Sequence, residues 1–485
     1  MKSLAKNSIY NILYKCSNLV FPLVISVYVS RILFAEGIGK VSSAQNIVTY
    51  FTLLAALGLP TYGTKIIAAC GENRLSRDKA FSELFIINLI STLICSGAYY
   101  IIVFNVPYFY QRLDLSIVCG LAIVFNAINV DWFYQGLEEY GYITLRNLII
   151  KLVSLVAVFL FVKTIDDYIV YALILTLSKV ANNIFNIIHL RKAVSITLQE
   201  IDVIKHVKPV FIFLASSVAI EVYTLADTTM LTFIHGDDIV GYYTTARKSI
   251  DVIRTMIVAV CAIYLPRLSY YYANQSKELF EKLVNKAIKI LTFITLPATA
   301  GVILTAELFV PLLFGNSFML SIATTQILSF SIITVAFSNF LGYQVLVTIG
   351  KEKYMLYSTI VGAIVNIVLN FALVFSLKQN GVAIASAITE LCVAIYQLNV
   401  VKKHVTIEGS KSLIMSVVFS TVAMSFCVII IKLLLSKERF LCFALSVVLG
   451  SAVYLIITLL CKNEIALDLT NKAKEYCLKF SRKKH

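Results

Sequence analysis

The chain is poor in charged residues, in proline and in tryptophan, and these shortages exclude an ordinary soluble fold. Charged side chains make up 14% of its 485 residues, against about 25% in soluble domains. Seven prolines and 19 glycines leave little material for long loops. Hydrophobic residues reach 59%, enough for about a dozen spans at roughly 20 apolar residues per membrane-spanning helix. We therefore predict an all-α, polytopic membrane protein.

The motifs of common enzymes and metal sites are also missing. The sequence has no Walker loop, no Gly-x-Ser-x-Gly elbow and no His-Glu-x-x-His motif, and none of its ten cysteines stands at Cys-x-x-Cys spacing. We therefore expect no enzyme activity, no metal and no cofactor. Because no motif would bind ATP, ATP hydrolysis by this chain is excluded as an energy source, and coupling to H⁺ or Na⁺ stays open.

What the chain has in excess is positive charge. Its 42 Lys and Arg residues against 27 Asp and Glu give a formal net charge of +15. In a soluble protein such an excess favours nucleic acid as the partner, but the positive-inside rule explains it here, so no nucleic-acid partner is predicted. Loops on the side of both termini hold roughly 29 Lys and Arg residues, against about 8 on the opposite side. Both termini are therefore predicted to be cytoplasmic.

Apolar runs and an internal repeat predict the organisation of the chain. About 14 runs are each roughly 18 to 25 residues long, as membrane crossing requires. Residues 38–46 match residues 240–248 in register, and a second similarity joins Tyr134-Gln135 to Tyr343-Gln344. If these matches are not due to chance, the repeat unit is six helices, and two lobes related by an axis along the membrane normal enclose a midplane cavity. The predicted parts are an N-lobe with spans 1–6 (residues 1–205), a C-lobe with spans 7–12 (residues 206–406), spans 13 and 14 (residues 407–462) and a cytoplasmic amphipathic tail (residues 463–485) on the anionic leaflet.

Charged residues inside the predicted spans mark the candidate site, because a lone charge at mid-helix costs about 2.5 to 3.5 kcal/mol. In span eight, Arg247, Asp251 and Arg254 follow one another at i, i+4 and i+7 and share one helical face. Lys248 adjoins this face. Since the bases outnumber the acid, we interpret the face as a cationic site that holds an anion in the cavity.

Three other bases are weaker candidates for the cationic cavity. Arg31 and Lys65 lie near the ends of spans one and two, where snorkelling to the interface explains them equally well. Lys179 lies in the middle of span six, where snorkelling is difficult.

Acidic residues in the spans are candidates for charge pairing or cation coupling. Asp227 in span seven is level with Lys248, counted along the hairpin at about 1.5 Å per residue. It either neutralises that base or shapes the field around the substrate. Asp131 in span four and Glu390 in span twelve would carry a coupling proton if a low dielectric favoured their protonated forms. The acidic candidates are Glu221, Asp227, Asp251, Asp131 and Glu390.

Several short motifs point to a known family. They are Phe21-Pro22-Leu23, Tyr28 to Leu33, Gly37 to Lys40, Trp132 to Gly136, and Asp227-Thr228 with Val240 to Tyr243. Together they resemble the motifs of Wzx-type polysaccharide flippases, which belong to the multidrug/oligosaccharidyl-lipid/polysaccharide (MOP) exporter superfamily. The family usually has Leu-Gly where this chain has Leu33-Phe34.

The resemblance implies that an undecaprenyl-diphosphate-linked oligosaccharide moves from the cytoplasmic to the periplasmic leaflet of a bacterial inner membrane. It implies alternating access, a role in O-antigen or capsule assembly, and the bilayer and a polysaccharide polymerase machinery as partners. Two alternatives use the same scaffold: a multidrug or toxin exporter, which would favour an acidic or neutral cavity, and a lipid II flippase. A purely structural scaffold is least favoured, because it has no need of Arg247 and Arg254 on one face.

Overall fold

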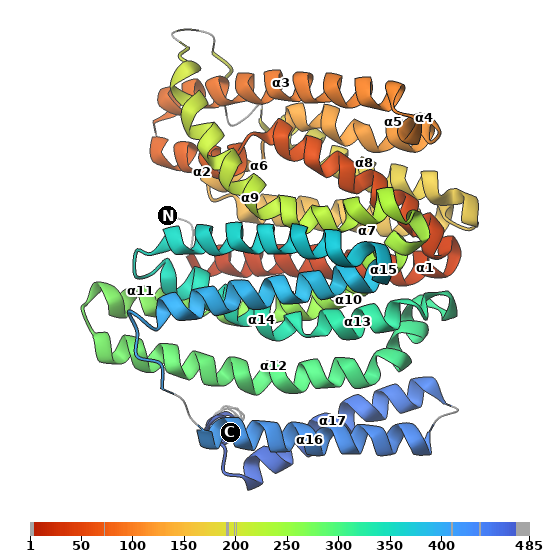
Figure 1. Ribbon diagram of the computed structural model, residues 1–485. Coiled ribbons are helices and arrows are strands. Elements are labelled where there is room, and N and C mark those ends of the chain that lie inside the picture. The colour runs from red at the N-terminus through yellow and green to blue at the C-terminus, as the bar shows by residue number, and fades with distance from the viewer. Residues whose placement is uncertain are drawn as a thin grey trace, which may run out of the picture. The chain divides into compact units, whose positions relative to one another are not determined.

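The computed structural model (Figure 1) describes residues 4–71, 73–190, 194–197, 199, 201–408, 411–435 and 438–471, with side chains from residue 17 onward except at 19, 216, 219, 220, 222 and 223. These residues form helices and no strand, which confirms the predicted all-α fold. The first part of the chain forms α1 (Leu4–Ala56), α2 (Leu59–Cys70), α3 (Arg74–Asn105), α4 (Pro107–Tyr110), α5 (Leu113–Val124), η1 (Phe125–Ile128), α6 (Asp131–Gly136), α7 (Tyr140–Phe161), η2 (Ile165–Asp167), α8 (Tyr168–Leu190), α9 (Ile204–Ile234) and α10 (Asp237–Ala262). The rest forms α11 (Leu265–Ala273), α12 (Lys277–Phe314), η3 (Asn316–Phe318), α13 (Ser321–Ser329), α14 (Ser331–Asn339), the π-helix η4 (Phe340–Leu346), α15 (Glu352–Val401), α16 (Lys411–Leu434) and α17 (Arg439–Leu460).

The helices account for the predicted number of membrane spans. Among the described residues, 10 helical stretches are long and apolar enough to cross a membrane. Two of these stretches each hold two spans, because a residue with a φ of 51° divides α1 at Phe34 and α15 at Lys378. The 31 residues of α9, and the shorter apolar stretch Leu113–Ile128 that leads into α6, bring the total to about fourteen. The multi-pass membrane fold is thereby confirmed.

The kink in α1 has a counterpart just before α10. Phe34 has a φ of 51°, and Gly236, its equivalent in the repeat, has a φ of 88°. A positive φ is strained for a bulky side chain and unstrained for glycine. Phe34 stands where the Wzx-type family usually has glycine, so this chain departs from the family pattern at a residue whose backbone favours glycine.

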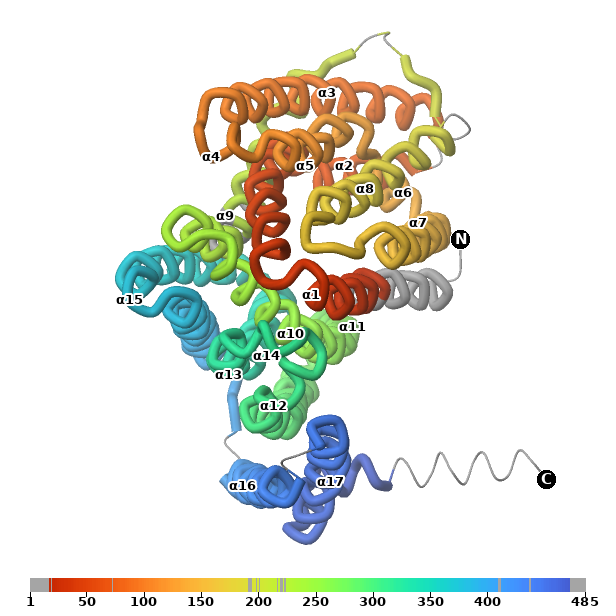
Figure 2. The backbone as a smooth tube through the Cα atoms, turned by 90° about the vertical axis from the view of Figure 1, so that its right-hand side faces the viewer, coloured from red at the N-terminus to blue at the C-terminus, as the bar shows by residue number. Residues whose placement is uncertain are grey.

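The chain packs into two compact units, Met1–Thr244 and Thr245–His485, which divide within α10. In the first unit α3 and α5 lie side by side, as both views show (Figures 1 and 2). The repeat predicts a boundary between two lobes at residues 205 and 206. This boundary separates the two copies of the repeat, not the two compact units, and it stays a prediction.

The core of the first unit is built around the aromatic residues of α6. Trp132 stacks on Phe81 of α3 with ring centroids 5.5 Å apart, and Tyr62 of α2 joins the same buried cluster. A Cβ atom on Gly63 would lie 2.6 Å from the Trp132 ring. The α2–α6 contact therefore requires glycine at position 63, and the cluster ties α2, α3 and α6 into one body.

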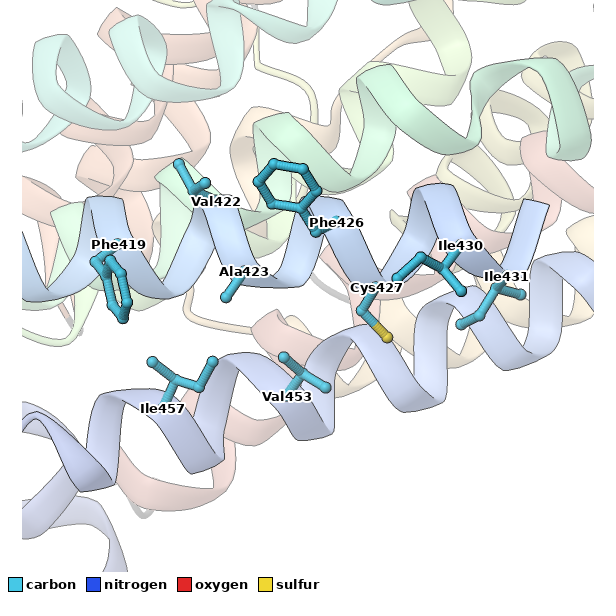
Figure 3. A pocket seen from close by; sticks show the side chains of 9 residues that line it. All are labelled: Phe419, Val422, Ala423, Phe426, Cys427, Ile430, Ile431, Val453 and Ile457. Carbon is cyan, nitrogen blue, oxygen red and sulfur yellow. The ribbon is translucent and has the colours of Figure 1, made fainter. Parts of the chain in front are cut away.

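In the second unit, α16 and α17 pack side by side and form an apolar groove of about 540 Å³ (Figure 3). Its wall consists of Phe419, Val422, Ala423, Phe426, Cys427, Ile430 and Ile431 from α16, and of Val453 and Ile457 from α17. Because these side chains offer almost no hydrogen-bonding groups, the groove matches hydrocarbon rather than water.

The first turns of the predicted tail pack against α12 within the second unit. Residues 464–471 are helical, and Ile465 and Ala466 are buried in a cluster with Phe293 of α12. Ion pairs from α12 add to this contact, with Lys286 Nζ 2.7 Å from the Asp468 carboxylate and Lys289 Nζ 2.8 Å from that of Glu464. The remainder of the predicted tail, residues 472–485, lies outside the described residues.

Candidate functional site

The predicted cationic face on α10 forms as a connected charge cluster. Asp251 accepts from Arg254 Nη1 at 3.1 Å and lies 3.7 Å from Arg247 Nε. Arg254 Nε also donates to Ser331 Oγ of α14 at 2.9 Å. One turn of helix separates Asp251 from each arginine, so helical geometry alone brings the three charges together.

The charge balance on this face is positive. The two guanidinium groups carry two positive charges and Asp251 carries one negative charge, and Lys248 beside them is half-buried. The side chains of Arg247 and Arg254 are 27% and 14% exposed, so both are largely withdrawn from solvent yet still reachable. The face therefore offers partly desolvated guanidinium groups that suit a bidentate oxyanion.

The acidic residues of α9 have partners that the sequence did not indicate. Asp227 is 2% exposed and accepts a hydrogen bond from Tyr243 Oη at 2.6 Å. Glu221 is half-buried and accepts one from Thr224 Oγ1 at 3.2 Å. Tyr243 entered the sequence analysis only as part of a family motif. The pairing of Asp227 with Lys248 stays a prediction.

Asp131 is one half of an ion pair whose other half the sequence analysis missed. Arg146 Nη2 of α7 lies 2.9 Å from Asp131 Oδ1, and Asn186 Nδ2 of α8 donates to the same oxygen at 2.7 Å. Arg146 also donates to Asn182 and to Asn186. Because the Arg146 side chain is only 5% exposed, this network fixes α6, α7 and α8 to one another. The role of Asp131 in cation coupling stays a prediction.

A second buried charge network joins α2, α3 and the start of α9. Glu83 is 1% exposed, and its carboxylate lies 2.8 Å from both Lys205 Nζ and His206 Nε2. The other ring nitrogen of His206 is 2.8 Å from Tyr62 Oη. No local sequence pattern predicts this network, because Glu83 and His206 are 123 residues apart along the chain.

The remaining candidates lie on separate helices. Arg31 on α1, Lys65 on α2 and Lys179 on α8 are exposed residues of the first unit. Glu390 is a half-buried residue in the second half of α15. Their roles in binding or coupling stay predictions.

Within the first unit, the second half of α1 crosses the start of α10 at very close range. A Cβ atom on Gly39 would lie 1.6 Å from the Asp237 carbonyl oxygen, and one on Gly241 would lie 1.9 Å from that of Ala35. Only glycine fits at either position. Gly39 is equivalent to Gly241 in the repeat, and Ala35 to Asp237, so the two contacts have the two-fold relation that the repeat predicts.

Side chains reinforce the same crossing. Thr244 Oγ1 donates to Ser42 Oγ at 3.5 Å, and these two residues are also equivalent in the repeat. Asp237 pairs with Arg112, whose Nη1 is 2.7 Å from the carboxylate, and accepts from Ser43 Oγ at 3.1 Å. The start of α10 is thus held to α1 by hydroxyl and backbone contacts, and to the N-terminal end of α5 by an ion pair.

Two solved membrane transport proteins have the same fold as this chain. The chain is similar to a structure titled "Lipid II flippase MurJ, inward closed conformation", with a TM-score of 0.77, 15% identity, and 94% of this chain and 99% of that chain covered. It is also similar to an inward-facing multidrug resistance MATE family transporter of the MOP superfamily, with a TM-score of 0.60, 19% identity, and 79% and 95% covered. The chain shares the fold of these two structures.

The sequence comparison is more specific. The chain belongs to the family described as "Polysaccharide biosynthesis protein", whose model matches residues 4–272. A protein of Shigella dysenteriae named "Putative O-antigen transporter" is 25% identical over 400 residues, which cover 82% of this chain and 100% of that protein. The resemblance derived from the motifs is therefore confirmed at the level of the family.

Proposed function

We propose that this protein is a flippase that moves a polyprenyl-diphosphate-linked oligosaccharide from the cytoplasmic to the periplasmic leaflet of a bacterial inner membrane. The observation that carries the proposal is the net positive face of Arg247, Asp251 and Arg254 in a membrane-spanning helix. The family and the name of the Shigella relative support a polysaccharide precursor as the cargo.

The chemistry of such a substrate matches this face. A diphosphate cannot cross hydrocarbon without a replacement for its hydration shell. Guanidinium groups replace that shell well, because they donate two parallel hydrogen bonds to phosphate oxygens. Asp251 would occupy the arginines between turnovers, and an incoming diphosphate would compete with it. The polyprenyl chain stays in the lipid bilayer. Apolar surfaces such as the α16–α17 groove are suited to contact this chain (Figure 3).

The crossing of α1 and α10 is suited to act as a gate. By the predicted topology it lies at the periplasmic end of the helices, so it must separate before a bulky oligosaccharide leaves on that side. The side-chain contacts between the two helices there are single hydrogen bonds between small polar groups. An interface of this kind has two discrete arrangements, packed and separated, as alternating access requires.

The energy source follows from the charge of the cargo. An inside-negative potential favours outward movement of about two negative charges by roughly 4 to 5 kcal/mol at about 100 mV. H⁺ or Na⁺ coupling would add to this, with Glu390 of α15 as one acidic candidate. No cofactor takes part, and association with a polysaccharide polymerase machinery is expected on the cytoplasmic membrane.

The test is complementation of a strain that lacks the gene. We expect wild-type protein to restore surface polysaccharide, and Arg247→Ala and Arg254→Ala to abolish it at normal membrane abundance. The variants Arg247→Lys and Arg254→Lys should retain part of it, because lysine keeps the positive charge but lacks the two parallel hydrogen-bond donors of arginine. Arg74→Ala is the matched control, since this α3 side chain is 64% exposed. Normal polysaccharide in the two Ala variants would contradict the proposal. Loss of drug resistance or of peptidoglycan synthesis in place of polysaccharide would favour a multidrug exporter or a lipid II flippase.

A further inference from the structure

A second cavity, in the second unit, lies apart from the α10 face. It has a volume of about 650 Å³ and is enclosed by the end of α11, the first turns of α12, the turn after η4 and the segment after α15. These connections belong to the loops that the positive-inside rule assigns to the cytoplasmic side. The cavity therefore opens at the level where lipid head groups meet cytoplasm.

Nitrogen donors from three separate connections line this cavity. Lys277 comes from the start of α12, Lys351 from the turn before α15, and His404 from the segment after α15. Since no helical or local pattern joins these residues, it is the fold that places them around one space. Two ammonium groups and an imidazole are donors that suit phosphate oxygens.

Glu281, the acid in the cavity wall, already binds the segment that follows α15. Glu281 Oε1 accepts from the Thr406 backbone N–H at 3.0 Å and from Thr406 Oγ1 at 3.1 Å, and Lys277 Nζ lies 4.0 Å from the same oxygen. These three donors offset its charge. Together the two lysines and the glutamate leave the cavity with net positive charge, so an anion is the ligand that it favours.

Aromatic residues form the rest of the wall. Tyr271 and Tyr272 close α11, and Tyr272 packs on Phe280 with ring centroids 5.7 Å apart. Tyrosines at the ends of membrane helices ordinarily form part of the interfacial aromatic belt. Here they instead wall a cavity that also holds cationic groups, which suits a head group with a phosphate and a ring or glycerol portion.

We propose that this cavity binds the phosphate-bearing head group of a lipid in the cytoplasmic leaflet. Two lipids share that chemistry: an anionic phospholipid and the diphosphate-linked substrate itself. In the second case the cavity is an entry site for the cargo, and only that reading rests on the function proposed above. Binding is measurable without transport, so a failure of the proposed function and a failure of this site are distinguishable.

The experiment compares the full-length protein with the triple variant Lys277→Gln/Lys351→Gln/His404→Gln. These side chains lie at the surface, and Lys277 is 77% exposed, so we expect the variant to fold normally. Lys282→Gln is the matched control, because Lys282 is an exposed lysine on the same helix that does not line the cavity. The probes are phosphatidylglycerol retained by the purified protein in native mass spectrometry, and a polyprenyl diphosphate titrated against the thermal unfolding midpoint.

We expect wild type and Lys282→Gln to bind at least one probe and the triple variant to bind it roughly tenfold more weakly, because several charge-assisted hydrogen bonds are lost. A loss confined to phosphatidylglycerol identifies a phospholipid site, and a loss confined to polyprenyl diphosphate identifies an entry site for the cargo. Equal binding by the triple variant and wild type, or no binding of either probe by wild type, would overturn the proposal.

Discussion

At the scale of single residues, the sharing of one carboxylate between two arginines sets how the α10 face treats an anion. Asp251 keeps Arg247 and Arg254 oriented while no cargo is bound, because each arginine lies within 3.7 Å of it. In the proposed mechanism, the net positive charge of this face is what favours a diphosphate. A face with equal numbers of acids and bases would hold the helices together equally well but would have no electrostatic preference for diphosphate.

The pair of Arg146, 5% exposed, and Asp131, 29% exposed, makes a prediction about stability. Removing Arg146 leaves the partly buried Asp131 carboxylate without its partner, at about 1 to 3 kcal/mol. We therefore expect Arg146→Leu to lower the thermal unfolding midpoint and the membrane abundance sharply, and the double variant with Asp131→Asn to recover much of both. Thermal unfolding of purified protein and immunoblots of membranes measure this. A single variant as stable as wild type, with the exposed Arg74→Leu as reference, would show that the pair contributes nothing.

What the sequence could predict at this scale depended on separation along the chain. Arg247, Asp251 and Arg254 were found because a helix brings residues at i, i+3 and i+4 together without tertiary information. Arg146 and Glu83 were missed because their partners come from other helices. Glu83 pairs with His206 across 123 residues, and only the packing of α2 against both α3 and α9 brings the two together.

At the scale of elements, the crossing of α1 and α10 is the feature that movement must disrupt. Gly39 and Gly241 allow backbones to touch there, and any side chain would force them apart. The repeat was visible in the sequence, but the consequence that equivalent segments contact each other was not, because a repeat does not reveal where its axis passes. The spans were predictable from the lengths of the apolar runs in the sequence. The kinks at Phe34 and Lys378 were not, because a change in backbone conformation does not alter the pattern of apolar residues.

The crossing predicts a reversible lock. In the double variant Ser42→Cys/Thr244→Cys, oxidation should join the two thiols, since the native hydroxyls are 3.5 Å apart. We expect the oxidised protein to stop exporting polysaccharide and a reductant to restore export, because the gate cannot separate while cross-linked. Electrophoretic mobility and surface polysaccharide measure the two effects.

Matched variants keep this result interpretable. Each single cysteine variant should be active under oxidising conditions. Adding Gly39→Ala should reduce cross-linking, while Gly97→Ala should not, because a Cβ atom on Gly97 meets nothing within 4 Å. Full export by completely cross-linked protein would show that the crossing does not open during transport.

At the scale of the whole molecule, composition and charge distribution were enough to predict the fold class. Few charges and long apolar runs favour helices that cross a membrane, because a helix satisfies its backbone hydrogen bonds internally. The division into units was less accessible, because it falls within α10 rather than in a linker.

Translocation by the purified protein tests the central claim most directly. Vesicles would contain a fluorescent polyprenyl-diphosphate oligosaccharide in both leaflets, and an impermeant glycosidase added outside would measure the fraction that becomes accessible. We predict that the accessible fraction in wild-type vesicles rises well beyond that in protein-free vesicles, and that Arg254→Ala vesicles behave like protein-free ones. Equal accessibility in wild-type and protein-free vesicles, with correctly folded protein present, would contradict the account.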